Sequence, residues 1–122
     1  MAWKFISGIA ISLQISDKLR ADILKGVYEY RGPFPTVRQL ASDAGVNPNT
    51  MQKALSVLED EKLIIAKSTA GRIVTDDPAV LECARRKALD SFTKEIILEA
   101  KGMSLHIDEL LENIEKGWCC YE

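Results

Sequence analysis

The chain has 122 residues and an apolar content of 47%, values typical of one small soluble domain or of such a domain with an appendage. No apolar run approaches the roughly 20 residues that a membrane span requires, and no secretory leader is recognisable, so we expect a cytoplasmic protein without membrane contact. The net charge is −2. Residues 1–75 carry ten basic and seven acidic side chains, whereas residues 76–122 carry six and eleven, so only the N-terminal part is suited to an anionic partner.

The first predicted element is a helix over about residues 11–25. Its apolar positions recur every four residues: Ile11, Ile15, Leu19 and Ile23. Gly26 follows as a stop signal. Residues 27–34 are predicted to form a loop, because Gly32 and Pro33 interrupt any regular pattern.

Two short helices hinged at one glycine follow. Thr36 is a suitable N-cap for the first, and Gly45 supplies the sharp turn after it. Asn47 is a suitable cap for the second, with Pro48 at the first helical position and an end near residues 60–62. At 100° per residue one face of this helix is apolar: Met51, Ala54, Leu55 and Leu58. The opposite face is polar: Asn49, Gln52, Lys53 and Ser56.

Two β-prone runs, residues 63–67 and 72–75, are separated by four small or polar residues and predict a hairpin. Pro78 then marks a boundary. We therefore expect a mainly α fold with an α+β wing: a winged helix-turn-helix domain over residues 1–75 and a two-helix dimerisation tail over residues 76–122.

The tail is predicted to hold a long helix from Pro78 to about Lys101, ended by Gly102, and a last helix capped by Ser104. Its apolar stripes are wider than two isolated helices can bury, so we expect a homodimer. The candidate interface residues are Leu81, Ala84, Ala88, Phe92, Ile96, Ile107, Leu110, Leu111, Ile114 and Trp118. The alternative is that the tail folds back on its own N-terminal domain.

The sequence gives little support for a metal site, a cofactor or catalysis. Three cysteines and one histidine, at spacings unlike those of zinc sites, predict no metal centre. We expect Cys83 to pack as a small apolar residue and Cys119 and Cys120 to be free thiols, with a redox role for the last two as the alternative. No nucleophile–base set or phosphate-binding glycine loop is present, so no enzyme and no cofactor are predicted.

The order helix, helix-turn-helix, hairpin is that of a winged helix-turn-helix, and its polar helix face suits the major groove of DNA. Side-chain amides can form hydrogen bonds with adenine, and a lysine can bind phosphate or guanine. The N-terminal turn of the helix also presents free N–H groups that favour a phosphate. Arg38, Lys67 and Arg72 are further candidate contacts. The pattern alone also allows a winged-helix protein-interaction module without DNA binding, or a small helical adaptor.

Residues 11–74 resemble the N-terminal domain of GntR-family bacterial transcription regulators, most closely the YtrA subfamily. The resemblance is carried by Pro35-Thr36-Val37-Arg38-Gln39-Leu40-Ala41, by Gly45-Val46-Asn47-Pro48-Asn49-Thr50-Met51-Gln52-Lys53-Ala54 and by the short two-helix tail. It implies a homodimeric repressor on pseudo-palindromic double-stranded operator DNA, with the tail as dimer interface. The candidate DNA-binding residues are Thr36, Arg38, Asn47, Asn49, Thr50, Gln52, Lys53, Lys67, Gly71 and Arg72.

The chain departs from that family in two places. The wing reads Thr69-Ala70-Gly71-Arg72 where relatives often have Gly-x-Gly, and Pro48 and Gln52 stand where many relatives carry arginine. The second difference favours A·T-containing steps, which amides read well. The tail is too short for a ligand-binding domain of its own, so a small-molecule effector, if the protein has one, is expected at the dimer interface or between tail and DNA-binding domain.

Overall fold

The computed structural model describes residues 3–67 and 71–121. The chain divides into two compact units, unit 1 (Met1–Ala88) and unit 2 (Leu89–Glu122). Within the described residues, no helix combines the length and the apolar character needed to cross a membrane. The expected boundary between a DNA-binding domain over residues 1–75 and a dimerisation tail over residues 76–122 is a division by function. It stays a prediction.

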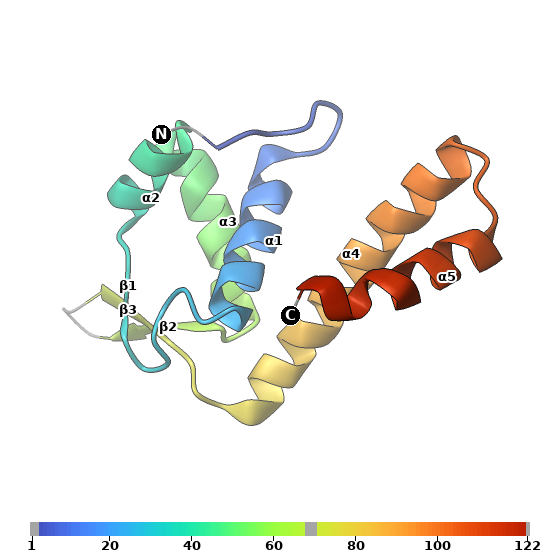
Figure 1. Ribbon diagram of the computed structural model, residues 1–122. Coiled ribbons are helices and arrows are strands. Elements are labelled where there is room, and N and C mark those ends of the chain that lie inside the picture. Colours follow the sequence, from blue (N-terminus) through green and yellow to red (C-terminus); the bar gives the residue numbers. More distant parts are fainter. Residues whose placement is uncertain (1–2, 68–70, 122) are drawn as a thin grey trace. The chain divides into compact units, whose positions relative to one another are not determined.

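Three helices form the core of unit 1: α1 (Ile11–Leu24), α2 (Val37–Ala44) and α3 (Pro48–Asp60) (Figure 1). The four-residue repeat of α1 buries Ile15, Leu19 and Ile23 completely, whereas Ile11 at the start of the helix remains exposed. The predicted apolar face of α3 is confirmed, because all four of its residues are 0% exposed. Each helix therefore turns its apolar stripe inward and leaves its polar face on the surface.

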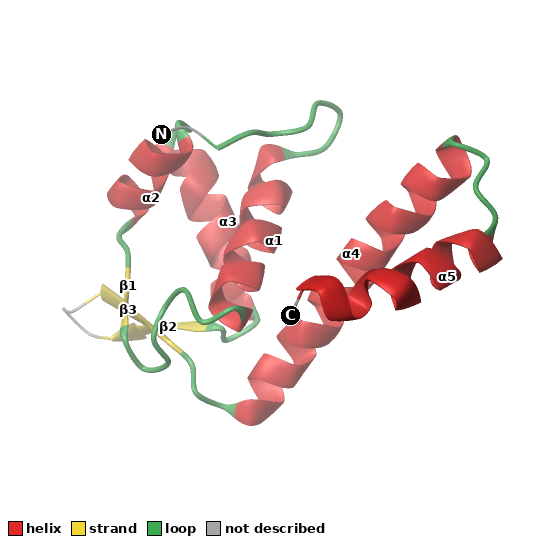
Figure 2. Cartoon of the chain, viewed as in Figure 1, coloured by secondary structure: helices red, strands yellow, loops and turns green. Residues whose placement is uncertain are grey.

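A three-stranded antiparallel sheet borders the helices, with the strand order β1-β3-β2 (Figure 2). The predicted hairpin is confirmed as β2 (Ile64–Lys67) and β3 (Gly71–Val74), while residues 68 to 70 at its tip lie outside the described residues. The prediction of a loop over residues 27–34 is wrong at its end. Strand β1 (Pro33–Phe34) pairs with β3, with Phe34 opposite Arg72. A two-residue strand containing proline shows no periodicity, so only the pairing with β3 reveals it.

The ends of the core helices are closed by backbone turns in which one residue adopts a positive φ. Gly45 has φ 72° after α2, where Val46 N–H donates to the Ala41 carbonyl oxygen at 3.0 Å. The same geometry follows α3, but there the residue with φ 65° is Lys62. This conformation is strained for any residue with a Cβ, so the end of α3 carries a local cost that glycine would avoid.

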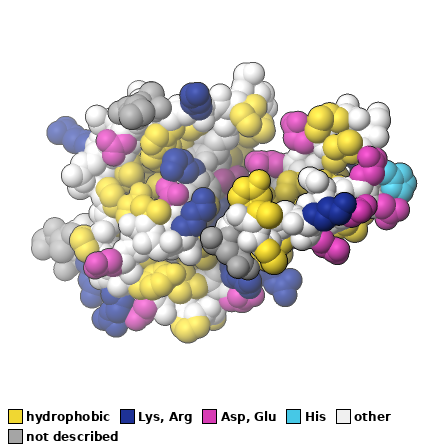
Figure 3. Space-filling view, in the orientation of Figure 1, with side chains coloured by type: hydrophobic (Ala, Val, Ile, Leu, Met, Phe, Trp, Pro, Cys, Tyr) yellow, Lys and Arg dark blue, Asp and Glu magenta, His cyan; other side chains and the backbone are white. Residues whose placement is uncertain are grey.

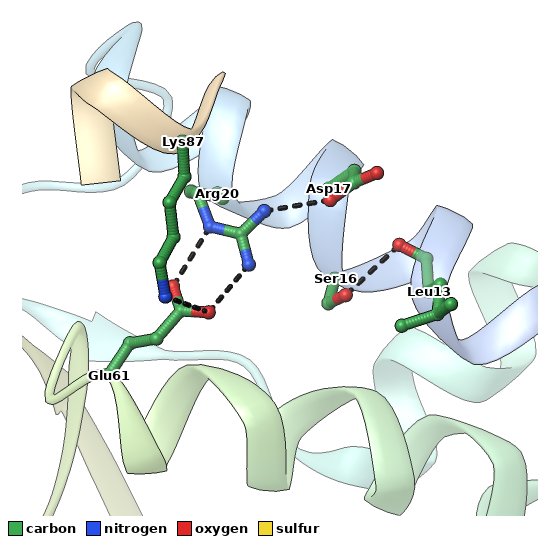
Figure 4. A network of polar contacts seen from close by, with 6 residues as sticks. All are labelled: Leu13, Ser16, Asp17, Arg20, Glu61 and Lys87. Carbon is green, nitrogen blue, oxygen red and sulfur yellow. Dashed lines mark hydrogen bonds and ion pairs between the residues drawn. The ribbon is translucent and has the colours of Figure 1, made fainter. Parts of the chain in front are cut away.

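A buried ion-pair network ties α1 to the end of α3 (Figure 4). The Arg20 guanidinium donates from Nε and Nη2 to the two carboxylate oxygens of Glu61 at 2.9 and 2.7 Å, and from Nη1 to Asp17 at 2.7 Å. Lys87 Nζ lies 3.4 Å from Glu61. Burial alone would raise the pKa of Glu61, but the hydrogen bonds and charge of Arg20, with a smaller contribution from Lys87, hold it below its ordinary value.

The first turns of α4 (Pro78–Gly102) belong to unit 1 and pack on its core. Ala84 is 2% exposed there, and Leu81 is partly buried beside it. Both side chains therefore pack within their own chain, although they were predicted to lie in the dimer interface. The expectation that Cys83 packs as an apolar residue is wrong, because Cys83 is exposed while the next residue, Ala84, faces the core. Cys119 and Cys120 are exposed free thiols.

Unit 2 consists of the rest of α4, α5 (Ile107–Trp118) and a short 3-10 turn (Cys119–Tyr121), with α5 folded back along α4 (Figure 1). The prediction that Ser104 caps the last helix is wrong. Ser104 has φ 59° and closes the end of α4, and its N–H donates to the Lys101 carbonyl oxygen. His106 is the N-cap: its Nδ1 accepts from the Asp108 N–H at 3.4 Å, and its own N–H donates to Glu109 at 3.0 Å.

Candidate nucleic-acid interface

The candidate interface is built on the turn between α2 and α3. Thr36 Oγ1 accepts from the Gln39 N–H at 3.2 Å, and Gln39 Oε1 accepts from the Thr36 N–H at 2.9 Å, so the first turn of α2 is closed from both sides. Gly45 then turns the chain within one residue. Because these signals are local, the sequence predicted both helices to within two residues.

The outer face of α3 presents a row of polar side chains to solvent. Asn49, Gln52 and Lys53 are exposed, and Thr50 is half-buried. The four fully buried residues of the opposite face hold the helix on the core, so the polar row is carried by a rigid support. A helix of this kind, polar outward and anchored inward, has the form that enters the major groove of DNA.

Two of the predicted DNA-binding residues cap helices in the free protein, so part of their hydrogen-bonding capacity is already used. The Asn47 side-chain oxygen accepts from the Asn49 N–H at 2.8 Å, which caps α3, so its free group is the amide NH₂. The hydroxyl of Thr36 is likewise engaged as the cap of α2. Gln52 Nε2 lies 3.4 Å from Ser56 Oγ, a long and exposed contact that a DNA base can replace.

Arg38 projects from the first turn of α2 and is exposed. It borders a shallow surface hollow of about 750 Å³, which lies along α2 and β1; its other lining residues are Pro33, Phe34, Pro35, Gln39, Ser42 and Asp43. Among the described residues, no carboxylate lies within ion-pair distance of Arg38, Lys53 or Lys67. These three cations are therefore available to an external anion, and phosphate is the anion such side chains bind on DNA.

The two sides of the wing differ. Lys67, at the end of β2, is exposed and pairs in the sheet with Gly71, which has φ 85°. Arg72, the next residue, turns back: its Nη2 lies 3.0 Å from Glu59 Oε1 on α3, and its side chain is only 20% exposed. The sequence did not reveal Glu59 as a partner, because the two residues are 13 positions apart and belong to different elements.

The structure brings Thr36, Arg38 and the α3 residues onto adjoining elements around one turn, with the wing as a separate group of candidates. On the face shown in Figure 3, Lys and Arg side chains lie in several separate groups. This view agrees with the modest net charge of residues 1–75.

The sequence model of a family described as bacterial regulatory proteins, gntR family, matches residues 11–74. Among curated proteins, the chain is 26% identical over 117 residues to the HTH-type transcriptional regulator YhcF of Bacillus subtilis, covering 92% of this chain and 93% of YhcF. It is 27% identical over 111 residues to the HTH-type transcriptional repressor YtrA of the same organism, covering 90% and 85%. The chain spans only 28% of the length of another relative, the regulator RB1450 of Rhizobium meliloti, to which it is 36% identical over 67 residues.

Solved structures agree in fold. A GntR-family transcriptional regulator from Listeria monocytogenes superimposes with a TM-score of 0.74 at 26% identity, covering 92% of this chain and 98% of that chain. The match extends over the tail as well as the winged helix-turn-helix.

Proposed function

The chain belongs to the GntR family of bacterial regulatory proteins, and we propose that it represses transcription by binding a pseudo-palindromic operator as a homodimer. The observation that carries the proposal is the α3 helix, which has four fully buried apolar residues on one face and Asn49, Gln52 and Lys53 exposed on the other. The relative YtrA, which bears the name of a repressor, supports the direction of regulation. A regulator of chromosomal genes acts in the cytoplasm, and we place this protein there.

In this proposal α3 lies in the major groove and its amides read bases. A glutamine or asparagine side chain pairs with both N6 and N7 of adenine, so Gln52 and Asn49 favour operators with A·T pairs at the positions they reach. Arg38 and Lys53 bind the phosphate backbone and fix the register of the helix. Lys67 extends the contact from the wing.

Unit 2 supports the homodimer. Its described residues include one buried apolar side chain, Ala100, whereas large apolar side chains are exposed on both helices, on the loop between them and on the 3-10 turn (Figure 3). They are Leu89, Phe92, Ile97, Leu98, Met103, Leu105, Ile107, Leu111, Ile114, Trp118 and Tyr121. Two short helices that bury so few apolar side chains are not stable alone. Packing against unit 2 of a second copy of the chain is the simplest way to bury the exposed ones. Leu81 and Ala84 are left out of the proposed interface, because they pack in unit 1.

The proposal is tested by titrating the intact protein with labelled DNA from upstream of its own gene. Three available cations per half-site predict about six phosphate contacts per dimer, hence a slope of log affinity against log salt of about −5. Arg38→Ala should weaken binding to all sequences and reduce the slope by about 2, one contact in each half-site. Gln52→Ala should reduce the preference for the operator over random DNA at an unchanged slope.

Lys94→Ala is a matched control, since it removes a charge from an exposed position in unit 2. It should leave affinity and slope as in the wild type. If neither Arg38→Ala nor Gln52→Ala changed binding, the assigned contacts would be wrong. A folded dimer that formed no specific complex at low salt would instead support the alternative of a winged-helix protein-interaction module.

A further inference from the structure

The ion pair between Arg72 and Glu59 joins the wing to the recognition helix α3. Arg72 lies on β3, the central strand of the sheet, opposite Ala66 on β2 and Phe34 on β1. Glu59 lies in the last turn of α3. The 3.0 Å contact therefore connects the one strand that touches both others to the helix that carries the candidate base-reading residues.

The burial of this pair distinguishes it from the exposed ion pairs of the molecule. The Arg72 side chain is 20% exposed and that of Glu59 is 31% exposed, whereas the Arg85–Glu82 pair on α4 is 76% and 56% exposed. The Nε atom of Arg72 is buried and has no hydrogen-bond partner among the described residues. The side chain thus lies against the protein surface, and the guanidinium is drawn away from solvent rather than held out toward a ligand.

We propose that Glu59 and Arg72 are positioning residues, whose ion pair holds the wing at a set angle to α3 so that Lys67 and α3 engage one DNA site together. This inference rests on the proposed function. It also reassigns Arg72, which the sequence suggested as a DNA contact. A partly desolvated carboxylate that lost its cation close to a polyanion would be unfavourable, so Arg72 stays with Glu59 when DNA binds.

The competing arrangement is a transfer of Arg72 from Glu59 to a DNA phosphate. The two arrangements predict opposite signs for one variant. If the pair positions the wing, Glu59→Gln weakens DNA binding because the wing is released. If Arg72 transfers, Glu59→Gln strengthens binding, because the variant removes both the competing carboxylate and a negative charge.

The experiment measures operator affinity of the intact protein over a range of KCl concentrations for wild type, Glu59→Gln, Arg72→Gln and the double variant. We expect each single variant to bind about fivefold more weakly and the double variant about as weakly as either one. The slope against salt should fall by the same amount in all three, by at most about 2, because each variant loosens the Lys67 contact in both half-sites. Tighter binding by Glu59→Gln, or a slope that falls in Arg72→Gln but stays that of the wild type in Glu59→Gln, would overturn the inference.

A second measurement needs no DNA. Amide hydrogen exchange at Ile65 and Ile73, which pair in the hairpin, should be about fivefold faster in Glu59→Gln and in Arg72→Gln than in wild type. Arg85→Gln, which breaks the exposed pair on α4, is the matched control and should leave these rates unchanged. Unchanged exchange in both wing variants overturns the inference even if wild type binds its operator. Failure of wild type to bind DNA would overturn the proposed function, while faster exchange would still support the anchoring of the wing.

Discussion

Replacing Glu61 by glutamine tests whether the buried network between α1 and α3 stabilises unit 1. The Arg20 side chain is only 6% exposed and places two of its three hydrogen bonds on Glu61, which is itself 13% exposed. A glutamine keeps one acceptor and turns an NH₂ group toward the guanidinium, so one hydrogen bond is lost and a buried cation is left partly uncompensated. Breaking a buried pair from one side costs about 3–5 kcal/mol.

We expect a loss of about 3 kcal/mol, at the lower end of that range, because Asp17 remains 2.7 Å from Arg20. For a domain of this size such a loss lowers the melting temperature by about 15 °C. The assay is urea and thermal unfolding followed by circular dichroism. Glu82→Gln is the control, since the pairs of Glu82 with Arg85 and Arg86 are both exposed, and its effect should stay within about 0.5 kcal/mol.

The same variant has a pH signature. The pKa of Glu61 is lower in the folded protein than its ordinary value, so folding favours the ionised carboxylate. The stability it contributes is fully present above its unfolded pKa of about 4.3 and is lost as pH falls through the folded pKa. The difference between wild type and Glu61→Gln should therefore shrink below about pH 4. A loss under about 1 kcal/mol at pH 7, or a difference that does not shrink as the pH falls below about 4, would refute this account of the network.

Three further predictions concern single positions. Lys62→Gly should stabilise unit 1 against urea by about 0.5–1 kcal/mol, because Lys62 has φ 65°; no gain would show that the turn is not strained. Asn47→Ala should cost about 1 kcal/mol of stability as a lost cap and Asn47→Ser very little, whereas both should weaken operator binding if the free amide group contacts DNA. Phe92→Glu, at a side chain 61% exposed, should shift the protein to monomers in light scattering; an unchanged dimer would contradict the proposed tail interface.

Much of the fold could be predicted from the sequence, because its signals are local. The four-residue repeat of α1, the cap and proline that open α3 and the glycine between α2 and α3 each act within one or two turns of chain. The face of α3 that carries Asn49 and Gln52 follows from its periodicity alone. The DNA-binding candidates on α2 and α3 were therefore identified as a group before their arrangement was known.

The tail shows where such local reasoning ends. Its helices were predicted within a few residues, but the last cap was assigned to Ser104 instead of His106, since serine has the stronger general preference for that position. Cys83 and Ala84 are neighbours in sequence, yet only Ala84 packs on the core. Helical spacing predicts a stripe, but it does not say which surface that stripe meets.

Periodicity and capping act between residues close in the chain, so the helix-turn-helix, its outward polar face and the hairpin follow from the sequence. The partners of the charged side chains and the third strand depend on contacts between distant parts of the chain, which the folded structure alone reveals. Arg20 meets Glu61 across 41 positions, and Arg72 turns from the expected DNA surface to Glu59 across 13. The free energy of such pairs depends on burial and on distance in space, and neither quantity is encoded in local spacing.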